Sequence, residues 1–335
     1  MRHRLNTWSL VLAGGDGRRL QGLTRNLYGV AVPKQFCSLR GGPSLLQEAL
    51  QRAATVAPQQ RVCAVVAAQH RQWWTAMLGN IADENVIVQP QNRGTAHGVL
   101  LPLLRIAARD PDAIVVLLPA DHYLRDEPTM AASLQRAAAL AAANLDVIYL
   151  LGIEPEEADT ELGYIVPKSG PRSQPARVLR FIEKPTATRA QALLNQGALW
   201  NAFIVAASVR ALLGLFDGSF DSTAAAMRCL KGPALDEFYQ QLRSIDFSRD
   251  VLQGNEAILQ VLPVPQCGWS DLGTPQRIAL ILRRLDVDGI APVWRANRAD
   301  HVNFTGHLNL ADQYAQLQSN RGGAAARFGR VDLHA

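Results

Sequence analysis

The chain has 335 residues, of which 48% are hydrophobic, so it can bury the core of one large folded unit. Its formal net charge is +5, but the lysines and arginines are scattered and only 6% of residues are aromatic, which disfavours nucleic acid as a partner. The four cysteines form no C-x-x-C pair, which disfavours a zinc site or a disulfide framework and fits a cytoplasmic location. The sequence contains no long apolar run of the kind that crosses a bilayer, so no membrane partner is expected.

The first half of the chain alternates apolar runs with stretches of helical periodicity. The pattern predicts strands over residues 8–13, 61–68, 85–88 and 113–118, and helices over residues 44–55, 69–78, 95–109 and 128–143. Strands that are apolar throughout and are separated by helices are typical of a parallel sheet with helices on both faces. The predicted fold class is therefore α/β, with a Rossmann-like, mostly parallel sheet.

The first predicted strand runs into a glycine-rich loop. Gly14, Gly15 and Gly17 carry no side-chain bulk, so backbone N–H groups can approach an anion, and Arg19 and Lys34 add positive charge. The loop has neither the Walker A pattern nor the dinucleotide pattern G-x-G-x-x-G. On its own, a glycine cluster more often forms a tight turn, but with the basic residues it predicts a nucleoside triphosphate site.

A second polar segment, Ala120 to His122, directly follows the strand predicted at 113–118. Ligands of doubly wound sheets bind beyond the carboxyl ends of the strands, so this segment and the glycine-rich loop should meet at one edge. Asp121 in this segment is either a metal ligand or a cap for the next helix.

From residue 146 onward the pattern changes to short strands and turns. The turn-rich stretch EPEEADTELG is followed by two predicted antiparallel strands, YIVP and VLRFIEKP. Further elements are a helix over 186–195, a strand over 199–206, a helix over 210–216 and a strand over 257–263. We expect one domain over residues 1–275, with halves at about 1–145 and 146–275. A C-terminal segment, 276–335, should follow it, beginning with a helix at 276–285 and ending as an irregular tail.

Eight short motifs occur in order along about the first 275 residues, and each is weak when taken alone. As a collinear set they resemble the signature of sugar-1-phosphate nucleotidyltransferases, and PKQF is similar to the mannose-1-phosphate guanylyltransferase branch. The resemblance implies a nucleotide-diphospho-sugar transferase fold whose second half is a sugar-binding lobe. The motifs are LAGGDGRRL, PKQF, QPQNRGTA (89–96), LPADH (118–122), ELGYIVP (161–167), FIEKP (181–185), WNAFI (200–204) and GWSDLGT (268–274).

The resemblance implies a nucleotide-binding set in the first half of the chain. Two positions depart from the family pattern: Arg18 stands where members usually have Thr or Ser, and Gly94 stands where they usually have Asn. Without the resemblance, the segment before residue 95 predicts only a loop with Thr95 as a helix N-cap. The implied nucleotide-binding residues are Ala13, Gly14, Gly15, Gly17, Gln89, Asn92, Arg93 and Thr95.

The resemblance also implies the charged groups that act on the phosphates. Arg19 and Lys34 match positions that neutralise the triphosphate, and Lys184 matches the position that holds the sugar phosphate. Asp121 and Asp271 match the two carboxylates that share a Mg²⁺ ion, the implied cofactor. The implied catalytic residues are Arg19, Lys34, Asp121 and Lys184.

Four residues of the second half match the family's sugar-phosphate site: Gly163, Glu183, Lys184 and Asn201. Without the resemblance, the alternative for Glu183 and Lys184 is a strand-end ion pair before the turn residue Pro185. Family members often read W-N-S-G, whereas this chain reads Trp200, Asn201, Ala202 and Phe203.

The activity expected from the resemblance is transfer of a guanylyl group from GTP to mannose 1-phosphate or a related hexose 1-phosphate. One alternative is a thymidylyl- or uridylyltransferase acting on another sugar 1-phosphate. Another is a non-catalytic regulator that binds a sugar nucleotide. The sequence does not determine the oligomeric state and is compatible with a homodimer.

Overall fold

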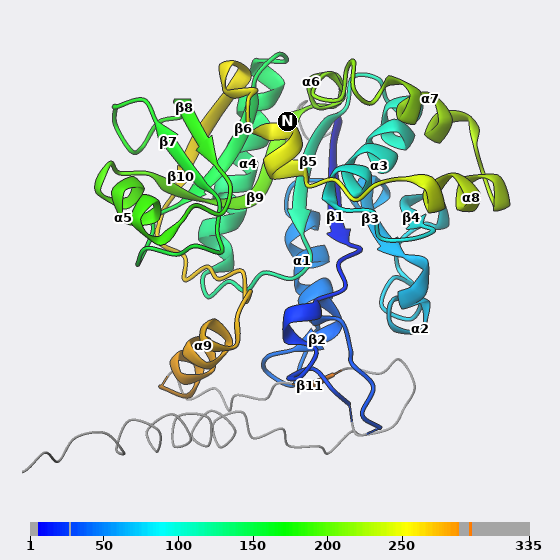
Figure 1. The fold of residues 1–335 in the computed structure, drawn as a ribbon, viewed down its shortest axis with the longest axis horizontal. Coiled ribbons are helices and arrows are strands. Elements are labelled where there is room, and N and C mark those ends of the chain that lie inside the picture. The colour runs from blue at the N-terminus through cyan, green and yellow to red at the C-terminus, as the bar shows by residue number, and fades with distance from the viewer. Residues whose placement is uncertain (1–5, 27, 288–294, 297–335) are drawn as a thin grey trace, which may run out of the picture.

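The structure, a computed structural model, describes residues 6–26, 28–287 and 295–296. Nine strands within these ranges form one mixed sheet across the molecule (Figure 1). From one edge to the other they are β4 (Val86–Gln89), β3 (Val62–Ala67), β1 (Thr7–Ala13), β5 (Ile114–Pro119), β9 (Leu199–Ser208), β6 (Ile148–Ile153), β10 (Leu259–Val264), β8 (Ala176–Ile182) and β7 (Tyr164–Pro167). A separate antiparallel pair joins β2 (Cys37–Ser38) and β11 (Arg295–Ala296).

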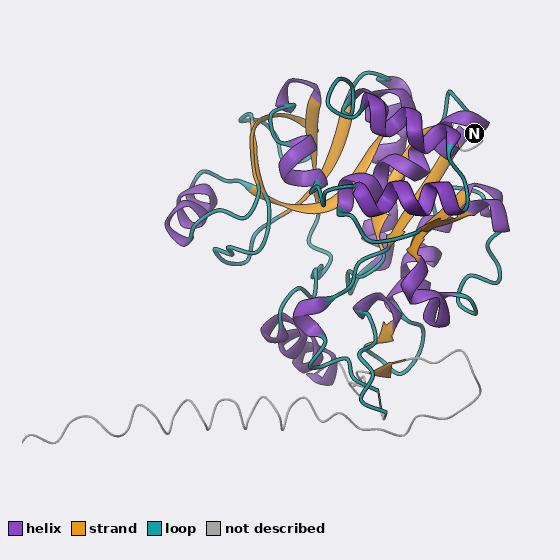
Figure 2. Cartoon of the chain, turned by 45° about the vertical axis from the view of Figure 1, so that its right-hand side comes forward, coloured by secondary structure: helices purple, strands orange, loops and turns teal. Residues whose placement is uncertain are grey.

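Helices cover both faces of the large sheet (Figure 2). Each face has its own hydrophobic core. One core includes side chains from α1 (Leu45–Ala54), α2 (Arg71–Trp74), α4 (Glu127–Ala143), α5 (Ala187–Asn195) and α9 (Pro275–Val287). The other includes side chains from α3 (Thr95–Arg109), α6 (Val209–Gly214), α7 (Asp221–Cys229) and α8 (Pro233–Gln241). The predicted α/β architecture is confirmed.

The first half of the sheet is parallel. Strand β1 pairs in parallel with β3 and β5, which places Val11 opposite Ala64 on one side and Leu118 on the other. All six residues of β5 are buried, as expected for a strand whose two faces are both covered. Because these strands run in the same direction, the loops after β1 and β5 emerge at the same edge.

The second half of the sheet is mixed. Strand β9 is antiparallel to β5 and β6, whereas β6 and β10 are parallel. The register of β9 against β6 shifts, because Leu150 lies opposite Val205 while Gly152 lies opposite Asn201. Two steps along β6 therefore correspond to four steps along β9, which makes a bulge at residues 202–204.

Several predicted boundaries agree with the structure. The helix predicted over 95–109 is α3, and Ser44 caps α1 through a capping box with Gln47. The residue that caps α4 is Asp126, whose side chain accepts from the Thr129 N–H at 3.0 Å, so Asp121 has no capping role.

Two predictions about helices were wrong. The helix predicted over 69–78 contains only one regular turn, α2, because the Trp74 indole donates to the Ala67 carbonyl at 2.9 Å and holds the segment against the end of β3. Thr95 is not the N-cap of α3, since Gly94 occupies that position. The Thr95 hydroxyl instead accepts from the Phe247 N–H at 2.7 Å.

The helix predicted at 276–285 is present as α9. The irregular tail predicted beyond it lies outside the described residues, apart from Arg295 and Ala296. No helix in the described part of the chain is both long enough and apolar enough to cross a membrane.

Candidate active site

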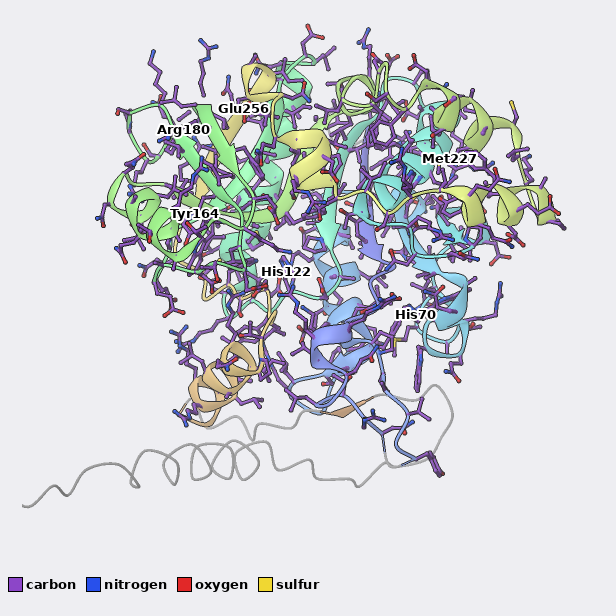
Figure 3. All side chains as sticks on the ribbon, in the orientation of Figure 1. His70, His122, Tyr164, Arg180, Met227 and Glu256 are labelled. Atoms are coloured by element: carbon purple, nitrogen blue, oxygen red, sulfur yellow. The ribbon has the colours of Figure 1, made fainter. Side chains whose placement is uncertain are left out.

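A cavity of about 300 Å³ opens where the loops after β1 and β5 meet the second half of the sheet. His122 lies at this junction, between the N-terminal segments and the lobe that carries β7 and β8 (Figure 3). The two polar loops predicted to share one edge do meet here, because both contribute lining residues. The lining includes nine of the predicted site residues: Gly15, Arg19, Thr95, Asp121, Gly163, Glu183, Lys184, Asn201 and Asp271.

Lys34 links the segment that carries Asp121 to the segment that carries Asp271, at one end of the cavity. Its Nζ lies 2.9 Å from Asp121 Oδ2 and 2.5 Å from the backbone oxygen of Asp271. The lysine side chain is only 7% exposed, so little water weakens these contacts. Burial, the largest single influence, would raise the pKa of the Asp121 carboxyl, but the charge of Lys34, the neighbouring His122 and the hydrogen bonds to the carboxylate together lower it. Asp121 is therefore held ionised.

Asp271 is held by a different cation. Its Oδ1 accepts from the Gly273 N–H at 3.0 Å and pairs with Arg277, in the first turn of α9. Burial raises the pKa of the Asp271 carboxyl, and the positive charge of Lys34 partly offsets this effect. Arg277 also pairs with Asp159, so one partly buried guanidinium links Asp271 to the loop before β7.

The two carboxylates suit a magnesium site in chemistry and in placement. Both line the cavity, and each contacts its partner cation through one oxygen, Asp121 through Oδ2 and Asp271 through Oδ1. The described residues contain no cluster of three or more His, Cys, Asp or Glu side chains that could enclose a metal. Mg²⁺ typically binds one or two carboxylates and takes its other ligands from water and substrate phosphates, so the residues present fit it.

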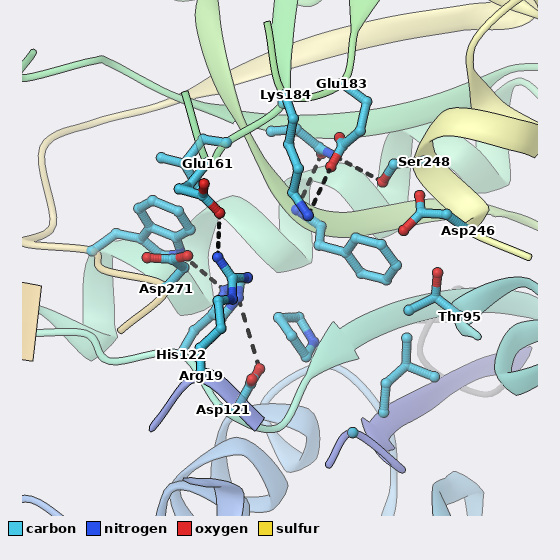
Figure 4. Close-up of a pocket in the computed structure, with 18 of the residues that line it drawn as sticks. Arg19, Thr95, Asp121, His122, Glu161, Glu183, Lys184, Asp246, Ser248 and Asp271 are labelled. Carbon is cyan, nitrogen blue, oxygen red and sulfur yellow. Dashed lines mark hydrogen bonds and ion pairs between the residues drawn. The ribbon is translucent and has the colours of Figure 1, made fainter. Parts of the chain in front are cut away.

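The two arginines of the glycine-rich loop point in different directions. Arg19 lines the cavity and pairs with Glu161 (Figure 4). The Arg18 side chain is 83% exposed and lies 3.3 Å from Asp16. Arg18 is therefore a surface residue, and Arg19 is the arginine that can reach a ligand in the cavity.

The opposite end of the cavity holds a second group of polar side chains, including Glu183, Lys184, Asp246 and Ser248 (Figure 4). Burial, and then the negative charge of Asp246, raise the pKa of Glu183 to about 7, while Lys184 acts in the opposite direction. Lys184 Nζ is 4.0 Å from Glu183 Oε1, and its side chain is 48% exposed. The lysine is thus only loosely paired and can turn toward an anion in the cavity.

Asn201 is oriented by its neighbours. Its Nδ2 donates to Ser248 Oγ at 3.4 Å, and its Oδ1 accepts from the Phe203 N–H at 3.1 Å. Gly163 lies beside Glu183, because a Cβ at residue 163 would lie 2.5 Å from Glu183 Oε2. Any side chain there would displace the Glu183 carboxylate.

A segment from the second half of the chain covers the start of α3. The Ile245 N–H donates to the Arg93 carbonyl at 3.2 Å, and the Ile245 carbonyl accepts from the Ala96 N–H at 3.1 Å. Gly94 has a φ of 86°, and a Cβ there would collide with the Ile245 backbone. The glycine at this position is therefore explained by the packing of Ile245, which leaves no room for an asparagine.

The remaining predicted nucleotide-binding residues lie around the cavity rather than in its lining. Arg93 donates to the carbonyls of Tyr239 at 2.8 Å and Gln240 at 3.0 Å, and Asn92 Oδ1 accepts from the Gly94 N–H at 3.0 Å. Arg93 therefore ties this loop to the last turn of α8, and Asn92 stabilises the loop itself. The backbone of the glycine-rich loop is held by Gln35, whose Nε2 donates to the carbonyls of Ala13 at 2.9 Å and Gly15 at 2.8 Å.

Gln89 is buried beside the glycine-rich loop. A Cβ at Gly14 would lie 2.8 Å from Gln89 Nε2, and one at Gly98 would lie 3.2 Å from the same atom. Gln89 Oε1 is buried and has no hydrogen-bond partner among the described residues. Gln89 is outside the cavity lining, and because an unpaired buried acceptor is costly, its side chain would gain a hydrogen bond by turning toward a ligand donor.

Sequence reasoning missed several residues that shape the site, among them Glu161, Asp246, Ser248 and Arg277. Glu161 lies two residues before Gly163 in the motif ELGYIVP, so its acidic charge beside a predicted site residue was an available signal. Asp246 and Ser248 lie in a stretch without regular periodicity, and only the folded chain brings them to Asn201. Arg277 lies in a predicted helix, where nothing marks it as facing Asp271.

Comparison with known proteins places the chain in a family. The nucleotidyl transferase family profile matches residues 8–285. The chain is 31% identical over 282 residues to the xanthan biosynthesis protein XanB of Xanthomonas campestris pv. campestris, covering 79% of this chain and 57% of that protein. It is 31% identical over 295 residues to mannose-1-phosphate guanylyltransferase 2 of Escherichia coli O157:H7, covering 81% of this chain and 58% of that protein. The chain thus spans a little more than half the length of these relatives.

Among solved structures, the chain is similar to a Thermus thermophilus protein described as a mannose-1-phosphate geranyltransferase. The two share 28% sequence identity with a TM-score of 0.72, covering 84% of this chain and 79% of that one. Because the family profile matches most of the chain and includes the whole cavity, this protein belongs to the nucleotidyl transferase family.

Proposed function

We propose that the chain is a sugar-1-phosphate nucleotidyltransferase that joins GTP to mannose 1-phosphate, giving GDP-mannose and pyrophosphate. The observation that carries this proposal is the division of one cavity into two ends. One end has Arg19, Lys34 and two carboxylates, and the other has Lys184 beside Glu183, Asn201 and Asp246. A triphosphate suits the first end, and a phosphorylated sugar suits the second.

The proposed reaction is an in-line displacement at phosphorus. An oxygen of the sugar phosphate forms a bond to the α-phosphorus of the nucleotide, the bond from that phosphorus to the bridging oxygen breaks, and pyrophosphate leaves with the electron pair. The attacking oxygen is already anionic at neutral pH, so no side chain has to remove a proton. The protein contributes orientation and charge: Lys184 holds the attacking phosphate, and Arg19 neutralises the leaving group.

Asp121 and Asp271 are the residues proposed to hold Mg²⁺. When bound, the ion would supply further neutralisation of the phosphate charge. Lys34 places the Asp121 carboxylate and the Asp271 backbone within reach of one another, so it organises this end of the cavity as well as adding charge.

Guanine is the proposed base. Gln89, next to the glycine-rich loop, has an unpaired buried acceptor, Oε1, that a turn of this side chain would present to the N–H donors on the Watson–Crick edge of guanine. The name of the Escherichia coli relative supports the same choice of substrates. Thymine and uracil also carry one N–H donor, so a thymidylyl- or uridylyltransferase is the alternative that a direct comparison must separate.

The test is a pyrophosphate-release assay with purified protein and Mg²⁺. GTP, dTTP and UTP are each paired with mannose 1-phosphate and glucose 1-phosphate. The proposal predicts the highest kcat/KM with GTP and mannose 1-phosphate. A preference for dTTP or UTP would contradict the choice of guanine, and the absence of pyrophosphate with every pair would contradict the enzyme assignment. Binding of GDP-mannose without turnover would support a regulator instead.

A further inference from the structure

Three non-glycine residues in the described part of the chain have a left-handed backbone, and all three are at the cavity. Their φ angles are 45° at Lys184, 54° at Phe203 and 49° at Leu272. Lys184 and Phe203 line the cavity, and Leu272 directly follows Asp271. This conformation is strained for a bulky side chain, and such strain persists where the surrounding structure enforces it.

The backbone of Phe203 is enforced by its strand and its neighbour. It lies in the bulge at residues 202–204, where β9 has two more residues than the stretch of β6 that it faces. Its N–H donates to Asn201 Oδ1 at 3.1 Å, and Asn201 is tied to Ser248. A bulge commonly redirects a side chain at the edge of an active site. Here it brings an aromatic residue into the lining of the cavity.

The ring of Phe203 is anchored on its protein side. It packs edge-to-face against Phe247, with ring centroids 6.0 Å apart and an interplanar angle of 64°. Phe247 is fully buried and stacks on Phe216 at 5.9 Å. Phe203 itself is half-buried, so its ring is held by a rigid aromatic cluster while part of it faces the cavity.

We propose that Phe203 is a specificity-determining residue that forms an apolar wall on the sugar side of the cavity and excludes sugar 1-phosphates with an additional bulky substituent, such as an acetamido group. This inference rests on the proposed function and deepens it. The strain at residue 203 is the cost of keeping a ring where the backbone geometry suits glycine.

Its neighbours place the ring on the sugar side. The Phe203 N–H is bonded to Asn201, and the ring packs on Phe247, which stands between Asp246 and Ser248 in the sequence. Asp246 is in turn close enough to Glu183 to raise the pKa of that carboxyl. The side chains around Phe203 are therefore those proposed to bind the hexose.

The experiment compares Phe203→Ala and Phe203→Gly with Phe238→Ala as the matched control. Phe238 is also half-buried against the same hydrophobic core, but it lies in α8, away from the cavity lining. For each protein, kcat/KM is measured with mannose 1-phosphate and with N-acetylglucosamine 1-phosphate at saturating GTP. The calorimetric Kd of each sugar phosphate is measured in parallel.

Both Phe203 variants should shift the selectivity ratio toward the acetamido sugar by about 10-fold or more, because opening a pocket wall changes discrimination by at least as much as a methylene does. The KM for GTP should stay within about twofold of the wild type, and Phe238→Ala should leave the ratio unchanged. An unchanged ratio in both Phe203 variants, or a raised KM for GTP with no change in ratio, would overturn the proposal.

A thermal unfolding series tests the strain without relying on activity. At residue 203 the glycine variant should melt at a higher temperature than the alanine variant, because only glycine adopts a φ of 54° without a steric cost. Phe238→Gly is added as a second control: inside helix α8 it should melt at a lower temperature than Phe238→Ala. The reverse order at residue 203 would show that no strain is stored there.

The two proposals can fail separately. If the wild type forms no pyrophosphate with any substrate pair, the proposed function fails, while the ratio of calorimetric Kd values still measures whether residue 203 selects among sugar phosphates. If the wild type is active and neither Phe203 variant changes the ratio of the two Kd values or the selectivity ratio, only the inference about Phe203 fails.

Discussion

The two ends of the cavity are built in different ways. At the end proposed to bind the triphosphate, here called the phosphate end, charged side chains from distant segments pair with one another: Lys34 with Asp121, Arg277 with Asp271, and Arg19 with Glu161. At the end proposed to bind the sugar phosphate, here called the sugar end, Lys184 is only loosely paired, and the shape depends on a strand bulge and an aromatic cluster around Phe203. The contrast indicates that charge organises the first end and backbone geometry organises the second.

The difference matters for how each end responds to substitution. Removing one charge at the phosphate end leaves its partner uncompensated and changes the field that a triphosphate meets. Removing a side chain at the sugar end changes the volume and the rigidity of the wall. Variants of the first kind should therefore affect turnover most, and variants of the second kind should affect selectivity.

The largest effect is expected at the two aspartates. Asp121→Asn and Asp271→Asn should each lower kcat by about 100-fold or more, because each removes a carboxylate proposed to hold the metal. Circular dichroism should show an unchanged fold, since both changes preserve side-chain size. Near-normal turnover in both variants would contradict the assignment of these residues to Mg²⁺.

The next largest effect is expected at Arg277, which orients Asp271 from outside the cavity lining. Arg277→Met should raise the Mg²⁺ concentration for half-maximal activity by about 10-fold, a typical cost of removing a residue that orients a metal ligand. The matched control is Arg284→Met, on the same helix, which removes an exposed pair with Glu156. Equal effects of the two variants would show that Arg277 only stabilises α9.

At the sugar end, the raised pKa of Glu183 predicts a pH-dependent change in stability. Between the ordinary carboxyl pKa and about 7, the folded protein binds a proton at Glu183 that the unfolded chain has released, so stability falls as the pH rises through this window. Glu183→Gln removes this dependence. The free energy of unfolding of the variant, relative to the wild type, should rise with pH across the window by at most about 3 kcal/mol.

Chemical denaturation at several pH values between about 4.5 and 8 measures this difference. A constant difference across the range would show that Glu183 titrates normally in the folded protein.

The smallest effect is expected at Glu161, whose pair with Arg19 is largely exposed. Glu161→Gln frees Arg19 for the triphosphate and should lower the KM for GTP by about two- to fivefold, since exposed ion pairs contribute up to about 1 kcal/mol. Glu154→Gln is the control, because it removes the same charge from the same loop but breaks only the pair with Arg172. If both variants change KM equally, the cause is the charge of the loop and not the pairing with Arg19.

Much of the fold could be predicted from periodicity, because buried parallel strands and amphipathic helices leave strong local patterns. The bounds of α3 and the cap of α1 at Ser44 are examples. The start of α3 shows where local reasoning ends: Thr95 has the chemistry of an N-cap, yet its hydroxyl is bonded to Phe247, a residue 152 positions later.

The candidate site shows the same contrast between residues marked by local sequence and residues placed by tertiary contacts. Residues inside motifs, such as Asp121, Lys184 and Asn201, could be predicted as candidates from the sequence, and the structure brings them to one cavity. Residues whose role depends on tertiary contacts could not. Arg277 and Ser248 reach Asp271 and Asn201 only through the packing of α9 and of the segment after α8. The left-handed backbone of Phe203 likewise has no signal in the local sequence.

The most direct test of the account is a crystal structure with GDP-mannose and Mg²⁺. The account predicts that the ligand lies in this cavity, with a diphosphate oxygen within hydrogen-bonding distance of Lys184 Nζ and the metal in contact with Asp121 and Asp271. The mannose ring should lie beside Asn201 and Phe203. A ligand bound outside the cavity, or a metal that contacts neither aspartate, would contradict it.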